Sequence, residues 1–131
     1  MKFELGLNIY RVYVDVYVYS DISDLSQINN ELSLLCKVHE DDLEEVFSGA
    51  ARTYPMYTDD DELRRIPVVF NESWMSAGTV AHEAFHIVYR VLASIGPTNI
   101  TEDTEEFWAY PIQYLVDGIL LNYEERKEIK K

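Results

Sequence analysis

Residues 76–97 read SAGTVAHEAFHIVYRVLASIGP, and this stretch decides how the rest of the chain is interpreted. Ser76, or Ser73 before it, is a residue of the type that caps helix N-termini. Apolar residues then recur at helical spacing, and the closing Gly-Pro pair is typical of a helix end. We therefore predict one amphipathic helix. Its buried stripe is expected to comprise Ala77, Ala81, Ala84, Phe85, Val88, Leu92 and Ile95.

The middle of this helix carries an HExxH motif, His82-Glu83-Ala84-Phe85-His86. Residues four apart stack on one face of a helix, so His82 and His86 are expected to offer two imidazole nitrogens to one zinc ion. Glu83, beside the first ligand, is then placed to take a proton from a water molecule on the zinc. The motif predicts a zinc-dependent hydrolase.

A catalytic zinc usually has three protein ligands and one open position, so the two histidines need a third partner. The segment after Pro97 supplies Glu102, Glu105 and Glu106 at the start of a second predicted helix, residues 102–124. A helical hairpin of this length can bring one of these carboxylates to the histidines. Helical phase alone leaves all three glutamates open.

The remainder of the chain predicts a small sheet and one more helix. Residues 7–19 alternate apolar and polar, which indicates one long strand with a bulge near Tyr10-Arg11. Residues 24–37 have helical spacing, with Cys36 near the end. Residues 40–56 are ambiguous: residues 40–45 are compatible with a longer helix, and residues 46–54 are interpreted as a strand. Residues 66–70 form a short apolar strand, which is expected to accept an extended peptide at its edge.

Length and composition favour one folded domain over residues 1–131. The chain has 131 residues, of which 47% are hydrophobic. It contains no apolar run of 18 residues, so we expect no membrane partner. The N-terminus lacks an apolar signal region, and the single Cys36 cannot form an intramolecular disulfide; both features favour a cytoplasmic location. The net charge of −13 argues against nucleic-acid binding.

Taken together, the motif and the EEFWAY stretch at residues 105–110 resemble the gluzincin class of zinc metallopeptidases in a minimal form. They also resemble small HExxH proteins encoded by bacteriophages. The resemblance covers about residues 66–121. It implies a zincin-like α+β fold, in which a small, mainly antiparallel sheet packs on the HExxH helix and a following antiparallel helix. It also implies zinc ligands His82, His86 and Glu106, with Glu83 as general base and a peptide or protein as substrate.

The oxyanion of such a reaction needs a hydrogen-bond donor besides zinc. Tyr110 is the first candidate and Tyr89 the second, because both are expected to face the cleft. Ten tyrosines are present, so either one has packing as its alternative role.

Other classes fit the motif less well. Peptide deformylases add an upstream cysteine ligand, but the surroundings of Cys36 lack their glycine-rich and cysteine motifs. A di-iron bundle needs a second ExxH motif and four long helices, and neither is present. The main alternative is a non-enzymatic acidic interaction protein, such as an inhibitor that imitates a nucleic acid, with a structural or vestigial metal site.

Overall fold

The computed structural model describes residues 1–36, 49–54, 57–58, 64–96 and 99–129. These residues form an α+β fold, as predicted, with a mixed sheet and long helices. The strands are β1 (Lys2–Leu7), β2 (Val12–Tyr19), β3 (Ala51–Thr53), β4 (Tyr57–Thr58) and β5 (Arg64–Asn71); the helices are α1 (Ile22–Cys36), α3 (Ala77–Ile95) and α4 (Glu105–Ile129), with 3-10 turns η1 (Asn8–Tyr10) and η2 (Glu72–Trp74).

The strands lie in the order β1-β2-β5-β3, with β4 also paired to β5, and most neighbouring strands run antiparallel. Strand β1 pairs antiparallel with β2, while β3 and β4 pair antiparallel with β5. Only the central pair, β2 and β5, is parallel among the described strands. β5 is therefore paired on both sides, so the prediction that residues 66–70 offer a free edge is wrong.

The predicted single strand over residues 7–19 is in fact a hairpin. Leu7 lies opposite Val12 at its closed end, and the chain reverses through η1. Arg11 completes the reversal in the left-handed region, with φ 54°, and its backbone N–H donates to the Asn8 carbonyl. Alternation continues on both sides of this turn, which is why the sequence pattern resembles one bulged strand.

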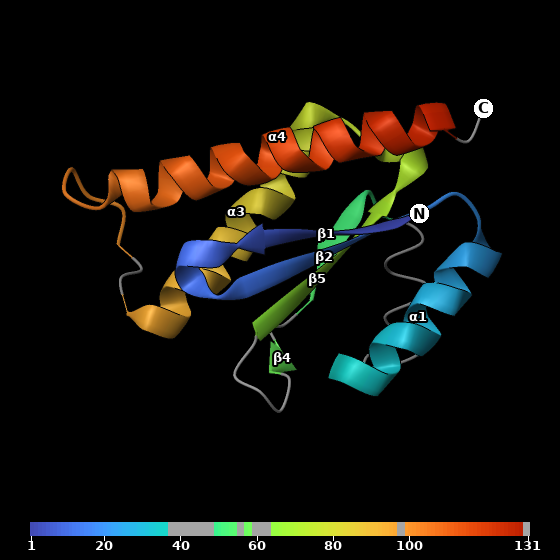
Figure 1. Ribbon diagram of the computed structural model, residues 1–131, viewed down its shortest axis with the longest axis horizontal. Coiled ribbons are helices and arrows are strands. Elements are labelled where there is room, and N and C mark those ends of the chain that lie inside the picture. Colours follow the sequence, from blue (N-terminus) through green and yellow to red (C-terminus); the bar gives the residue numbers. More distant parts are fainter. Residues whose placement is uncertain (37–48, 55–56, 59–63, 97–98, 130–131) are drawn as a thin grey trace.

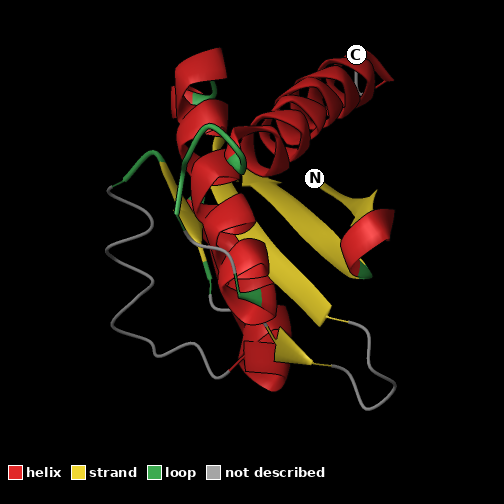
Figure 2. Ribbon diagram, turned by 90° about the vertical axis from the view of Figure 1, so that its left-hand side faces the viewer, coloured by secondary structure: helices red, strands yellow, loops and turns green. Residues whose placement is uncertain are grey.

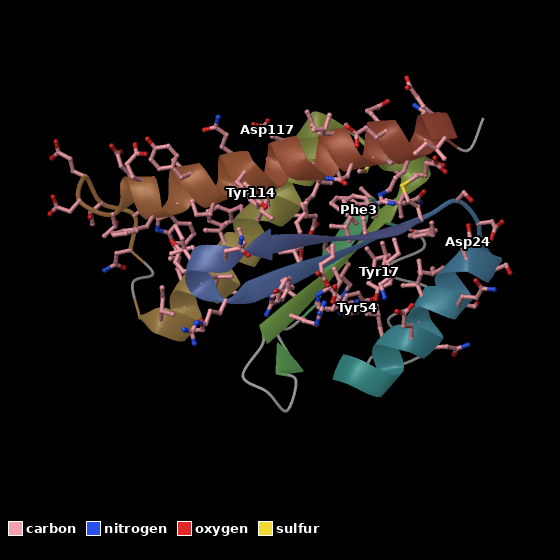
Figure 3. All side chains as sticks on the ribbon, viewed as in Figure 1. Phe3, Tyr17, Asp24, Tyr54, Tyr114 and Asp117 are labelled. Carbon is pink, nitrogen blue, oxygen red and sulfur yellow. The ribbon has the colours of Figure 1, made fainter. Side chains whose placement is uncertain are left out.

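The two faces of the sheet carry different helices. One face, which includes Val14, Val16 and Val68, packs against α3 and α4. The other face packs against α1 through Tyr17 and Tyr19 on the sheet and residues such as Leu25 and Leu32 on the helix. Figures 1 and 2 show α3 and α4 on one side and α1 on the other. In Figure 3, Phe3 lies between the sheet and α4, whereas Tyr17 lies towards α1.

Helix α3 buries a face that differs in part from the predicted stripe. Of the predicted stripe, Ala77, Ala81, Phe85 and Ile95 are exposed. The buried residues are Val80, Glu83, Ala84, Ile87, Val88, Val91 and Leu92. The helix is rotated towards β3, which it contacts beside Glu83. This rotation leaves His82, His86 and Tyr89 exposed, as predicted.

Helix α4 packs across α3 and also covers β1 (Figure 1). It continues through Pro111, although a proline inside a helix usually bends or breaks it. A Cβ on Gly118 would come within 3.1 Å of Leu5 Cδ1, so glycine permits the close approach of α4 to β1. Near the end of α4, the Tyr123 hydroxyl donates to Glu72 Oε1 at 3.1 Å and ties the helix to η2.

The predicted strand over residues 46–54 lies only partly within the described residues, and residues 40–45 lie outside them. Of the predicted strand 46–54, the structure describes only residues from 49 onwards, and β3 lies within that part. Within the described ranges, no helix is both long enough and apolar enough to cross a membrane.

Candidate metal centre

The HExxH histidines lie one turn apart on the exposed side of α3. Ser76 positions the helix start, because its Oγ accepts a hydrogen bond from the backbone N–H of Thr79 at 3.1 Å. Ser76, and not Ser73, is therefore the cap. Gly96, with φ 121°, ends the helix in a conformation that favours glycine. Between these caps, His82 Nε2 and His86 Nε2 approach to 3.1 Å.

This separation fits two ligands of one zinc ion. Zinc–nitrogen bonds of about 2.0–2.1 Å in a tetrahedral site place two nitrogens about 3.3 Å apart. The ring planes meet at 69°, so the rings are not stacked face to face. The same nitrogen separation also suits a hydrogen bond between the rings, in which one Nε2 donates to the other. Both side chains are accessible from solvent.

Glu83, unlike the two histidines, lies on the buried side of α3. The residue is only 5% exposed. The Thr53 hydroxyl, at the end of β3, donates to Glu83 Oε2 at 2.5 Å. A hydrogen bond to a carboxylate is strong, so Thr53 restricts the Glu83 side chain beside the first histidine.

The third zinc ligand is not assembled in the structure. Among the described residues, no group of three or more His, Cys, Asp or Glu side chains is placed to hold a metal ion. The histidine pair therefore has no third protein ligand within these residues. The assignment of Glu102, Glu105 or Glu106 to this position stays a prediction.

Glu106 and Tyr110 line a cavity between α4 and η1, and neither His82, Glu83 nor His86 contributes to its wall. Both residues are exposed, Tyr110 to 66%. No hydrogen bond among the described side chains joins Tyr110 to the HExxH residues. Its predicted role as oxyanion donor is therefore also untested.

Glu105 lies on a different face of α4 from Glu106. Trp108, three residues after Glu105, stacks on Phe85 of α3 with ring centroids 5.4 Å apart, and its ring is 6.2 Å from that of Tyr89. Residues three apart share a helix face, so Glu105 lies on the side of α4 that packs against α3. Glu106 is displaced around the helix from Trp108 by about 200°.

Thr53 is the contact of this site that the sequence analysis missed. It precedes Glu83 by 30 positions, and the two meet only because β3 pairs with β5 in a particular register. No local pattern marks such a threonine. The predicted strand over residues 46–54 includes it but does not indicate which face it occupies.

No family model matches this chain. No curated protein and no solved structure matches it either. The case for a function therefore depends on the arrangement of the residues themselves.

Proposed function

We propose that this protein is a zinc-dependent hydrolase that cleaves peptide bonds. The observation that carries the proposal is the 3.1 Å separation of His82 Nε2 and His86 Nε2. Glu83 follows His82 in the sequence, and Thr53 holds its carboxylate. Two imidazoles that converge beside a glutamate are the parts that metal-assisted hydrolysis requires. A metal-free interaction protein needs neither the convergence nor the neighbouring acid.

His82 and His86 would hold the zinc ion. Zinc supplies a Lewis acid that polarises a carbonyl group and lowers the pKa of water towards 7. Glu83 accepts the proton of the attacking water and passes it to the leaving amine. The bond from Thr53 occupies Oε2 of Glu83, so we assign proton transfer to Oε1.

The third ligand in this proposal is a glutamate from the start of α4. The resemblance to gluzincins implies Glu106. Glu105 is favoured instead by its position, because it lies on the side of α4 that packs against α3, where the histidines are. Glu102 precedes the helix and remains the third candidate. Separate Gln substitutions at the three positions distinguish them, because only the ligand's substitution should reduce zinc content.

A peptide substrate is favoured by the sheet edge beside Glu83. Among the described strands, β3 ends the strand order, and its Thr53 contacts the proposed general base. An extended peptide can add to such an edge through main-chain hydrogen bonds. We therefore propose β3 as the strand to which the peptide adds, in place of residues 66–70, because β5 is paired on both sides.

Metal content tests the proposed centre. The purified chain is expected to bind about one equivalent of zinc, and His82→Ala and His86→Ala should each lose most of it, since a single imidazole holds zinc weakly. Gln113→Ala, at an exposed position of α4, is the matched control and should keep zinc. A folded wild-type protein that stays metal-free in excess zinc would contradict the proposal.

Peptide cleavage tests the role of Glu83. Glu83→Gln should keep zinc but lower the cleavage rate of an unstructured protein such as casein by at least about 10²-fold, because general-base catalysis contributes this much. Glu125→Gln makes the same charge change at an exposed site of α4 and should cleave normally. If wild type and Glu83→Gln are equally inactive in cleavage, the acidic interaction protein becomes the better explanation.

A further inference from the structure

A second candidate site lies apart from the histidines, where the β1–β2 hairpin meets α4. It is a cavity of about 500 Å³ between η1 and the first half of α4. This volume lies within the range of about 300–1,000 Å³ that is usual for small-molecule sites. Its wall is mainly apolar and contains four aromatic side chains, Tyr10, Phe107, Tyr110 and Tyr114. Figure 3 shows Tyr114 on α4.

One charged side chain, Glu106, shares this wall with the aromatic rings. Among the described residues, no Lys, Arg or His pairs with its carboxylate. Phe107, Tyr110 and Tyr114 are between 48% and 66% exposed. The aromatic surface and the carboxylate are therefore both accessible from solvent, and they face the same cavity.

The backbone of the hairpin shapes the other side of the cavity. A Cβ on Gly6 would come within 2.7 Å of Asn8 Oδ1, so a side chain at position 6 would displace Asn8 from the wall. Arg11, in the left-handed region, closes η1 and holds Tyr10 at the hairpin end. The hairpin thus presents Tyr10 to the aromatic residues of α4.

We propose that this cavity binds an organic cation, specifically an alkylated ammonium group. Aromatic faces attract such cations through their quadrupoles, and several rings together recognise quaternary ammonium ions. The Glu106 carboxylate adds direct charge complementarity. The net charge of −13 raises the local concentration of cations around the protein.

Titration with choline tests the proposal, with 3,3-dimethylbutan-1-ol as the neutral molecule of the same shape. Chemical shifts of backbone amides report binding and locate it. Choline should shift the amides of η1 and of α4 near Glu106, and it should bind about tenfold more tightly than the alcohol. Sodium chloride at equal ionic strength controls for general attraction to the acidic protein.

Variants separate the two components of the site. Glu106→Gln and, independently, Tyr110→Leu should each weaken choline binding at least about fivefold. Glu125→Gln, the matched charge control on α4, should leave it unchanged. Equal binding of choline and the alcohol, or shifts spread over the whole surface, would overturn the proposal.

This proposal assigns Glu106 to the cavity and therefore leaves Glu105 or Glu102 as the third zinc ligand. His82→Ala shows whether the cavity and the zinc centre are separate. His82→Ala should bind choline as the wild type does, whether or not the wild type holds zinc. Loss of choline binding in folded His82→Ala would overturn the assignment of the site to this cavity. Failure of the zinc proposal would appear only in metal content and cleavage.

Discussion

The hydrogen bond between Thr53 and Glu83 links the proposed general base to the sheet. Thr53→Val keeps the shape of the side chain and removes the donor, which leaves a buried carboxylate without this partner. An unsatisfied buried polar group costs about 1–3 kcal/mol, more if charged. We expect the free energy of unfolding to fall by about that amount, as measured by urea denaturation.

Thr53→Ser is the matched control, because serine keeps the hydroxyl and loses only a methyl group. It should retain most of the stability that Thr53→Val loses. In a Glu83→Gln background, the valine substitution should cost less, since a neutral amide is cheaper to bury than a carboxylate. Equal stability of wild type and Thr53→Val would mean that this contact does not hold Glu83.

At the scale of single residues, the sequence predicts what helix geometry controls. His82 and His86 converge because four residues make about one turn, and Ser76 caps because hydroxyl side chains suit that position. Thr53 was not predictable, since its partner depends on strand register. The side of α4 that Glu106 occupies was also not predictable, because a phase error of one residue rotates a side chain by about 100°.

At the scale of elements, the start of α3 determines where the histidine pair lies. Ser76→Ala removes the side chain that accepts from the Thr79 N–H and donates to the Thr79 hydroxyl. Loss of an N-cap costs about 1 kcal/mol. We expect thermal unfolding to shift down by several degrees, which is the usual effect of this loss in a domain of this size.

Ser73→Ala is the control for this cap. Ser73 is also an exposed serine just before α3, but its backbone N–H donates to Asn71 Oδ1 and its side chain does not cap the helix. Its substitution should leave the unfolding temperature nearly unchanged. Equal effects of the two substitutions would show that the Ser76 side chain contributes nothing specific.

Sequence periodicity identified most elements but not their pairing. The helices around residues 24–37, 77–95 and 102–124 follow apolar spacing and were found at nearly their observed positions. The hairpin at η1 was missed because alternation persists across the turn. The double pairing of β5 was missed because a short apolar strand looks the same at an edge and in the centre, although an uncharged run such as residues 66–70 is typical of a central strand.

At the scale of the whole molecule, the sheet divides the core into two layers that use different residues. Mostly aliphatic side chains, with Phe3, Phe70, Trp108 and Tyr123 among them, fill the layer towards α3 and α4, which positions the HExxH helix. Three tyrosines, Tyr17, Tyr19 and Tyr54, contribute to the layer towards α1. Buried tyrosines make the fold less stable at alkaline pH, because burial disfavours the ionised form of their hydroxyls.

Two tyrosines, Tyr17 and Tyr123, determine the pH range in which stability falls. Burial raises the pKa of Tyr17 to about 12. Burial and the hydrogen bond that it donates to Glu72 raise the pKa of Tyr123 to about 12. In the unfolded chain both should ionise near pH 10. Between these values the folded state binds more protons than the unfolded state, so stability falls as pH rises.

We therefore expect the free energy of unfolding to be constant below about pH 9 and to decrease between about pH 10 and pH 12, by about 1–2 kcal/mol for each of the two tyrosines. Urea denaturation across this range measures the slope. The double variant Tyr17→Phe/Tyr123→Phe should be flatter, because it has neither hydroxyl to ionise. Tyr110→Phe removes a hydroxyl that is largely exposed and should keep the wild-type slope. If the double variant loses stability with pH as steeply as the wild type, the alkaline sensitivity arises from the overall negative charge and not from these two buried side chains.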